Sequence, residues 1–216
     1  MGKEEHREML FWTKEEYLKF ADAMMDKPVS YYAFGILYWC GLRMGELLAL
    51  TPVDFNFETH TLRINKSYQR LHREDVITPP KTLKSNRTIK MPQFLCDEMQ
   101  DYLKMLYEPK EDERIFTISK SYLHHEMNRG SKVSGVKRIR VHDLRHSHVS
   151  LLINMGFTVL AIADRMGHES IDITYRYAHL FPSEQTQMAE QLDIERMEKI
   201  KWRRIWTVKE DGETKS

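Results

Sequence analysis

Apolar residues in the first fifty positions recur at the spacing of helices. Thr13 stands three residues before Glu16, which predicts a capping box at the start of a helix with an apolar stripe. The run from Tyr31 to Cys40 is apolar almost all round and predicts a buried central helix. Gly41 is expected to end that helix, and a short helix is expected from about Gly45 to Leu50.

The pattern changes in the next forty residues. Thr61–Ile64 alternates as a strand does, Pro79 and Pro80 interrupt the chain, and Arg87–Met91 resembles a returning strand. These features predict a small antiparallel β-sheet inserted at about residues 54–91. Residues 114–118 are interpreted as one more short strand.

Helical spacing returns after the predicted sheet. A helix is expected from near Pro92, and the chain is expected to be mostly helical from Val141 onward. Val159–Met166 forms a clear apolar stripe that Gly167 ends. The predicted fold class is therefore mainly α with a small antiparallel β-sheet (α+β).

Composition narrows the class of protein. Hydrophobic residues make up 41% and charged residues 30%, as in globular rather than disordered chains. The longest near-apolar run, residues 31–42, is shorter than the roughly 20 residues that span a bilayer. The polar N-terminus carries no secretory signal, and Cys40 and Cys96 are too few for a disulfide framework. A cytoplasmic protein without membrane partners is expected.

The net charge of +1 hides two basic segments. Residues 61–90 hold eight Lys or Arg against two acids, and residues 129–145 hold six against one. Such segments suit a polyanion-binding face, but solvated surface charge explains them equally well.

Two short segments place cations where chemistry could occur. Arg43 lies between Gly41 and Gly45, so its planar fork could meet a phosphate at close approach. His142 and Arg145, three residues apart, would share one helix face and join a proton-transfer group to a permanent cation. Each segment alone is equally compatible with an ordinary helix end.

A third segment contains Gly167-His168 and, nine residues after His168, Tyr177. If a helix runs through it, Tyr177 lies about 160° from Tyr175 around the axis. We therefore expect Tyr175 in the core and Tyr177 displayed away from it.

Taken together, these segments resemble the tyrosine recombinases, the family of phage and transposon integrases. The resemblance covers roughly residues 13–182 and follows the family's order. Gly41-Leu-Arg43-x-Gly-Glu46 is similar to the first arginine box, and Lys81-Thr-x-x-Ser85-x-Arg87 to the lysine segment of a β-hairpin. His142-x-x-Arg145 and Gly167-His168 with Tyr177 are similar to the remaining boxes.

The resemblance implies an enzyme that cuts and rejoins DNA through a 3′-phosphotyrosine, without metal, ATP or other cofactor. Arg43, Arg145 and His168 would bind the phosphate, and Tyr177 would attack it. His142 is the candidate base, Lys81 the candidate acid, and Glu46 would orient Arg43. Candidate DNA-binding residues are Arg70, Lys84, Arg87, Lys137, Arg138 and Arg140.

The implied partners are double-stranded DNA attachment sites and further copies of the chain. The protein is expected to be a monomer alone and a tetramer on DNA. We expect a catalytic domain at residues 1–182 and a C-terminal helix and tail at 183–216. Trp202 and Trp206 in that tail could dock on a neighbour or on their own domain. Family members carry a helical domain before the catalytic one, and none fits upstream of Thr13, so a catalytic domain without it is expected.

Other functions remain open to different degrees. A type IB topoisomerase would use the same chemistry, and a non-catalytic DNA-binding module would explain the basic segments alone. A metal hydrolase is disfavoured because the chain has no H-E-x-x-H or Cys-x-x-Cys pattern. His148, six residues after His142, does not easily share its helix face.

Overall fold

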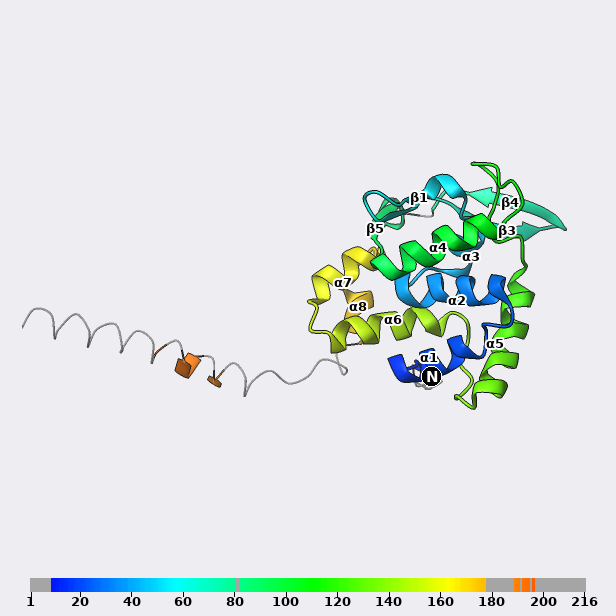
Figure 1. Ribbon diagram of the computed structural model, residues 1–216. Helices are drawn as coiled ribbons and strands as arrows, with labels where there is room; N and C mark the ends of the chain where they lie inside the picture. The colour runs from blue at the N-terminus through cyan, green and yellow to red at the C-terminus, as the bar shows by residue number, and fades with distance from the viewer. Residues whose placement is uncertain (1–8, 81, 178–188, 191, 195, 197–216) are drawn as a thin grey trace, which may run out of the picture. The chain divides into compact units, whose positions relative to one another are not determined.

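The computed structural model describes residues 9–80, 82–177, 189–190, 192–194 and 196 (Figure 1). The chain divides into two units, Met1–Leu180 and Phe181–Ser216, and the architecture below is that of the first. Lys81 and the tail residues Trp202 and Trp206 lie outside the described residues. In the second unit, residues 189–190, 192–194 and 196 are helical.

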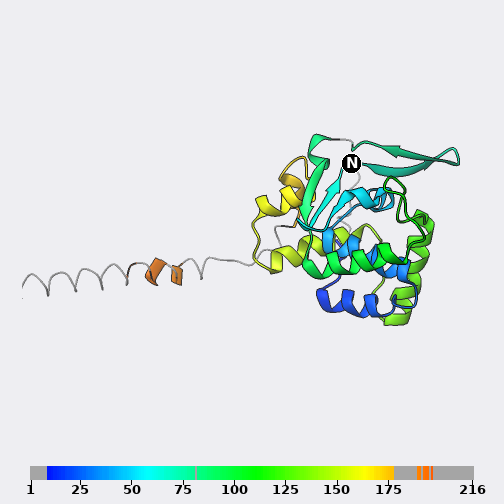
Figure 2. The ribbon, with the colours of Figure 1, turned by 45° about the horizontal axis from the view of Figure 1, so that its top comes forward.

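Helix α2 (Pro28–Cys40) is the central helix predicted from its apolar run, and eight of its 13 residues are buried. It contacts α1 (Lys14–Asp22), α4 (Gln93–Met105) and α6 (Asp143–Asn154). The helix begins at Pro28, three residues earlier than expected, because proline is well tolerated in the first turn, where no N–H is needed. In both ribbon views the strands lie on one side of α2 and α1 lies on the other (Figures 1 and 2).

The capping box at Thr13 is confirmed, since its side chain accepts from the Glu16 N–H and Glu16 accepts from the Thr13 N–H. Helix α5 (Lys120–Ser134), which packs on α1, was not predicted. Its only buried apolar side chains are Leu123 and Met127, so the apolar stripe in the sequence is narrow.

The inserted β region is confirmed and consists of two small sheets. Strands β1 (Phe55–Asn56), β2 (Thr61–Ile64) and β5 (Arg87–Lys90) form an antiparallel sheet in the order β1-β2-β5. Strands β3 (Ser67–Leu71) and β4 (Glu74–Thr78) form a separate antiparallel hairpin.

The strand expected at residues 114–118 is wrong. These residues are described and form no strand, although the Ile115 N–H donates to the Leu50 carbonyl at 2.9 Å. Side chains take the place of a strand partner, because the Tyr102 hydroxyl donates to the Ile115 carbonyl and Arg114 donates to the Phe116 carbonyl.

Short elements complete the unit. Helix α3 (Met44–Ala49) packs on β3, and α7 (Val159–Met166) packs on α8 (Asp172–Tyr175). Two 3₁₀ turns, η1 (Pro52–Asp54) and η2 (Leu83–Ser85), precede β1 and β5. The mainly helical class with a small antiparallel sheet is confirmed, and no described helix is long and apolar enough to cross a membrane.

Candidate active site

One cavity of about 750 Å³ brings together residues from widely separated parts of the sequence. Five of the six predicted catalytic residues line it: Arg43, His142, Arg145, His168 and Tyr177. The sixth, Lys81, lies outside the described residues. Arg138, Arg140 and Arg176 also line the cavity, so its wall is strongly cationic.

Arg43 reaches the cavity because the chain turns sharply between α2 and α3. Gly41 ends α2 in the left-handed region at φ 66°, and a Cβ there would lie 2.7 Å from the His148 ring. Arg43 then begins α3. Its backbone N–H donates to the Glu46 carboxylate at 2.9 Å, and its Nη1 donates to the same carboxylate at 2.7 Å. The Arg43 side chain remains 41% exposed, which leaves its outer edge available to a ligand.

Arg145 is buried and has no carboxylate within ion-pair distance among the described residues. Its guanidinium donates instead to the carbonyl of Gly41, at 2.7 Å, and to that of Met166. These carbonyls lie at the C-terminal ends of α2 and α7, where helix dipoles favour a cation. Burial, with the nearby charge of Arg43, lowers the pKa of Arg145 to about 9, so it is still protonated at neutral pH.

An anion should therefore stabilise the folded protein through Arg43 and Arg145. A desolvated cation without a carboxylate gains most when an anion enters beside it. Sulfate at ten times its dissociation constant should raise the free energy of unfolding by about 1.4 kcal/mol. Denaturant titrations of the wild type and of Arg43→Gln, each in sodium sulfate and in sodium chloride of equal ionic strength, measure this difference, because the general stabilising effect of sulfate is common to both proteins. An equal effect of sulfate on the two proteins would contradict an anion site at this cavity.

Two predicted histidines flank the arginines. His142 precedes the first turn of α6 and is exposed, yet partial desolvation and the charge of Arg145 lower its pKa. His168 is buried, and its Nδ1 lies 2.8 Å from the Thr174 hydroxyl. Burial, followed by the charges of Arg145 and Arg43, lowers the pKa of His168 to about 4. His168 is therefore neutral at pH 7 and can hydrogen-bond a ligand without adding charge.

The predicted orientation of the two tyrosines is wrong. Tyr177 is only 4% exposed, whereas Tyr175 is 53% exposed. Helix α8 contains four residues and ends at Tyr175, so the 100° helical step does not extend to Tyr177. Tyr177 instead turns inward and lines the cavity with Arg145. Burial, opposed by the charge of Arg145, raises the pKa of Tyr177 to about 12.

His146 also lines the cavity, and the sequence analysis did not assign it to the site. Its Nδ1 contacts the Tyr177 hydroxyl, and the two ring centroids are 5.6 Å apart. Its Nε2 lies 3.8 Å from a carboxylate oxygen of Asp143. Burial and the neighbouring His142 lower the pKa of His146 to about 4. The signal was present, because positions 142 and 146 share a helix face.

The predicted DNA-binding residues fall into two groups. Five of them lie at the surface or at the cavity wall: Arg70, Lys84, Lys137, Arg138 and Arg140. Arg87 is different, since its side chain is 6% exposed and paired with Glu46. The structure thus places most of the Arg87 side chain inside the protein, and not at the surface expected of a DNA-binding residue.

A family model and the curated relatives of the chain point to the same family. Residues 11–184 match the model of the phage integrase family. The chain is 31% identical over 202 residues to the ICEBs1 integrase of Bacillus subtilis (strain 168), covering 87% of this chain and 55% of that protein. It is 28% identical over 152 residues to the integrase of Mycobacterium phage D29, covering 66% of this chain and 41% of that protein. The chain thus spans about half the length of the curated relatives it matches.

Solved structures share the fold. The Tn1549 transposon integrase in complex with transposon right end DNA has a TM-score of 0.72 at 20% identity, covering 91% of this chain and 68% of that one. The catalytic domain of bacteriophage HP1 integrase has a TM-score of 0.60 at 20% identity, covering 85% and 95%. At these identities the likeness concerns the fold.

Proposed function

Because the chain belongs to the phage integrase family, we propose that it holds the centre with which a tyrosine recombinase cuts and rejoins DNA. The observation that carries the proposal is the single cavity in which Arg43, His142, Arg145, His168 and Tyr177 meet. A merely DNA-binding module has no need to bury a tyrosine hydroxyl beside two arginines and three histidines.

In the proposed reaction the Tyr177 hydroxyl oxygen attacks the scissile phosphorus. A bond forms between that oxygen and phosphorus, and the bond from phosphorus to the 5′ oxygen breaks. The hydroxyl proton leaves tyrosine, and the departing 5′ oxygen takes up a proton. The 3′-phosphotyrosyl link conserves the energy of the broken phosphodiester bond, so the reverse step rejoins DNA without ATP.

The arginines carry the electrostatic part of this proposal. Negative charge grows on the nonbridging phosphate oxygens in the transition state, and fixed cations aimed at them lower the barrier. Arg145 is held by two carbonyls and Arg43 by Glu46, so both are oriented before DNA arrives. His168 would add a neutral hydrogen-bond donor.

His146 shares the proton-transfer role that the sequence assigned to His142. A tyrosine whose pKa is about 12 needs a base in contact with its hydroxyl. His146 Nδ1 makes that contact, and the ring is neutral at pH 7. The Asp143 carboxylate, 3.8 Å from the other ring nitrogen, would stabilise the positive charge that His146 gains with the proton. His142, whose ring centroid is 5.2 Å from that of His146, would then pass the proton toward solvent. Lys81 remains the proposed acid for the 5′ oxygen.

Double-stranded DNA attachment sites are the proposed substrate, with four copies of the chain on DNA for strand exchange. The cationic wall formed by Arg138, Arg140 and Arg176 supports binding of a polyanion. A DNA complex is known for the structurally similar Tn1549 integrase. The tail from Ser183 is proposed to act in assembly rather than in bond chemistry.

A covalent-trapping experiment tests the proposal. The full chain is incubated with duplexes that span the ends of the mobile element carrying its gene, nicked so that the cut product diffuses away. We expect an adduct that survives denaturant and disappears after protease treatment. Tight DNA binding without adduct on any such duplex would favour the non-catalytic DNA-binding module.

A further inference from the structure

Arg87 is the most completely satisfied arginine near the cavity. Its guanidinium makes four hydrogen bonds: two to Glu46 at 3.0 and 3.1 Å, one to the Ser85 carbonyl at 3.2 Å and one to the Arg165 carbonyl at 3.1 Å. Its side chain is nearly buried, as is that of Glu46. Four of its five N–H groups are thus used within the protein, so Arg87 serves mainly the interior.

The partner that Arg87 holds is the residue that orients Arg43. One oxygen of Glu46 accepts from Nη1 of Arg43 and Nη1 of Arg87, at 2.7 and 3.1 Å. The other accepts from the Arg43 backbone N–H and from Nη2 of Arg87, at 2.9 and 3.0 Å. The two-pronged grip of Arg87 therefore fixes the plane of the carboxylate against which Arg43 is aligned.

Arg87 also determines how much of the Arg43 charge is left for a ligand. The three side chains carry two positive charges and one negative charge, because Glu46 is ionised. Burial disfavours that ionisation, but the hydrogen bonds and charge of Arg87, together with those of Arg43, outweigh it and lower the pKa of Glu46 to about 2. Without Arg87, one buried carboxylate would face Arg43 alone and cancel its charge.

The same guanidinium contacts the turn that leads to His168. Its Nε donates to the carbonyl of Arg165, in the last turn of α7. Gly167 follows in the left-handed region, and a Cβ there would lie 2.9 Å from Cδ of Arg87. The side chain of Arg87 thus fills the space that this glycine leaves and supports both the Arg43 turn and the His168 turn.

We propose that Arg87 is a positioning residue that, through Glu46, holds Arg43 in line with the scissile phosphate and keeps its charge available. This rests on the proposed function. In this proposal Arg87 affects the rate of the phosphate chemistry and is not part of the DNA-binding surface.

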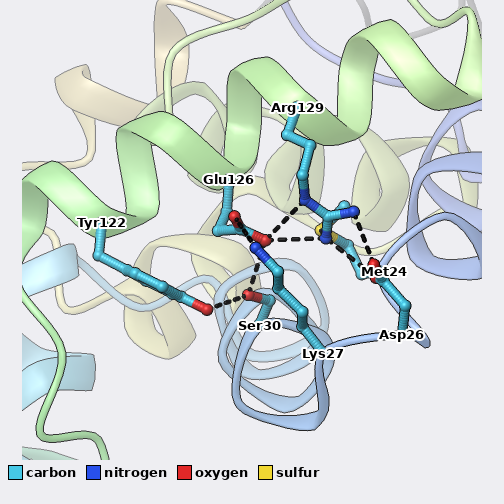
Figure 3. Close-up of polar contacts among 7 residues, drawn as sticks. All are labelled: Met24, Asp26, Lys27, Ser30, Tyr122, Glu126 and Arg129. Carbon is cyan, nitrogen blue, oxygen red and sulfur yellow. Dashed lines mark hydrogen bonds and ion pairs between the residues drawn. The ribbon is translucent and has the colours of Figure 1, made fainter.

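The protein contains a matched control for this arrangement (Figure 3). Glu126 is a second nearly buried glutamate shared by two cations, with Lys27 at 2.8 Å and Arg129 at 2.8 Å. Arg129 also pairs with Asp26, and Ser30 donates to Glu126. None of these described residues lines the cavity. Arg129→Met therefore removes the same type of ion pair without touching the proposed centre.

The test compares full-length variants in single-turnover adduct formation on the nicked duplexes. Arg87→Met should slow adduct formation about 10- to 100-fold. Arg87→Lys, which keeps the charge but loses the fork, should recover part of that loss. Arg129→Met should lower Tm but change the rate less than about 3-fold. An equal rate loss in Arg129→Met would overturn the proposal, because the loss would then follow from instability.

Two further measurements separate positioning from the alternatives. In a Glu46→Gln background, where no carboxylate can cancel the Arg43 charge, Arg87→Met should leave the slope of log Kd against log salt unchanged, and a slope smaller by about one would show that Arg87 contacts a DNA phosphate after all. In a Glu46→Gln background, adding Arg87→Met should slow the reaction less than about 3-fold further, since both act through one carboxylate. Multiplied losses would contradict action through Glu46. The double variant removes both buried charges together, so it remains informative if Arg87→Met alone does not fold.

Failure of the proposed function has a different signature. If the wild-type chain forms no adduct, the sulfate-dependent rise in Tm still reports on Arg43 and Arg145. Arg87→Met should reduce that rise, whereas Arg129→Met should keep it. An unchanged rise in Arg87→Met would overturn the role of Arg87 independently of DNA cutting.

Discussion

Replacing Tyr177 by phenylalanine is expected to abolish the covalent protein–DNA adduct. The substitution removes one oxygen, the proposed nucleophile, and leaves the ring buried in the cavity wall. No other described tyrosine lines this cavity, so no second hydroxyl is placed to replace it. Loss of the contact with His146 should lower the free energy of unfolding by only about 1 kcal/mol. Denaturing gels on nicked duplexes measure the adduct, and chemical denaturation measures the stability.

Tyr175→Phe is the matched control. Tyr175 lies two residues away, is half exposed and does not line the cavity, so its hydroxyl should be dispensable. DNA affinity should be nearly unchanged in both variants, because neither alters a charge. Adduct in the Tyr177→Phe variant, or its loss in Tyr175→Phe alone, would show that Tyr177 is not the nucleophile.

Arg145→Lys should reduce the rate of adduct formation about 10²- to 10³-fold, even though the charge is kept. The arginine spans the Gly41 and Met166 carbonyls and still turns an edge toward the cavity. A lysine has one nitrogen and cannot bridge both carbonyls and a phosphate. One buried carbonyl left without a donor should also lower the free energy of unfolding by about 1–3 kcal/mol. Single-turnover rates and denaturant titrations report the two effects separately.

Arg114→Lys controls for the structural part of that loss. Arg114 donates to the Leu48 carbonyl and to Asp75, and it does not line the cavity. The Arg114→Lys variant should be less stable than the wild type but should form the adduct at the same rate. If Arg145→Lys stays within about 3-fold of the wild-type rate, the forked geometry of Arg145 has no part in the chemistry.

The elements predicted correctly from sequence are those with a strong local signal. The Thr13 cap, the apolar run of α2 and the stripe of α7 each depend on residues within one helix. Helix α5 was missed because only Leu123 and Met127 mark its buried face. Residues 114–118 were assigned as a strand because alternation alone does not say whether a strand partner is present.

The site shows the same division. The residues of the boxes could be found from their spacing and resemblance, and the structure brings five of them to one cavity. The sequence could not show which side chains pair when they lie far apart along the chain. Arg87 was assigned to the surface because arginine usually lies there, and its carboxylate lies 41 positions away. The burial of Tyr177 depends on where a four-residue helix ends, which no periodicity determines.

The bridge made by Arg145 has a consequence for how the protein is synthesised. It joins Gly41, 104 positions earlier in the chain, to Met166, 21 positions later. The anion pocket therefore cannot close on the ribosome while only the first half of the domain has emerged, and the proposed nucleophile is translated later still. Nascent chains that end before Tyr177 lack the proposed nucleophile, so they cannot form the proposed covalent link to DNA.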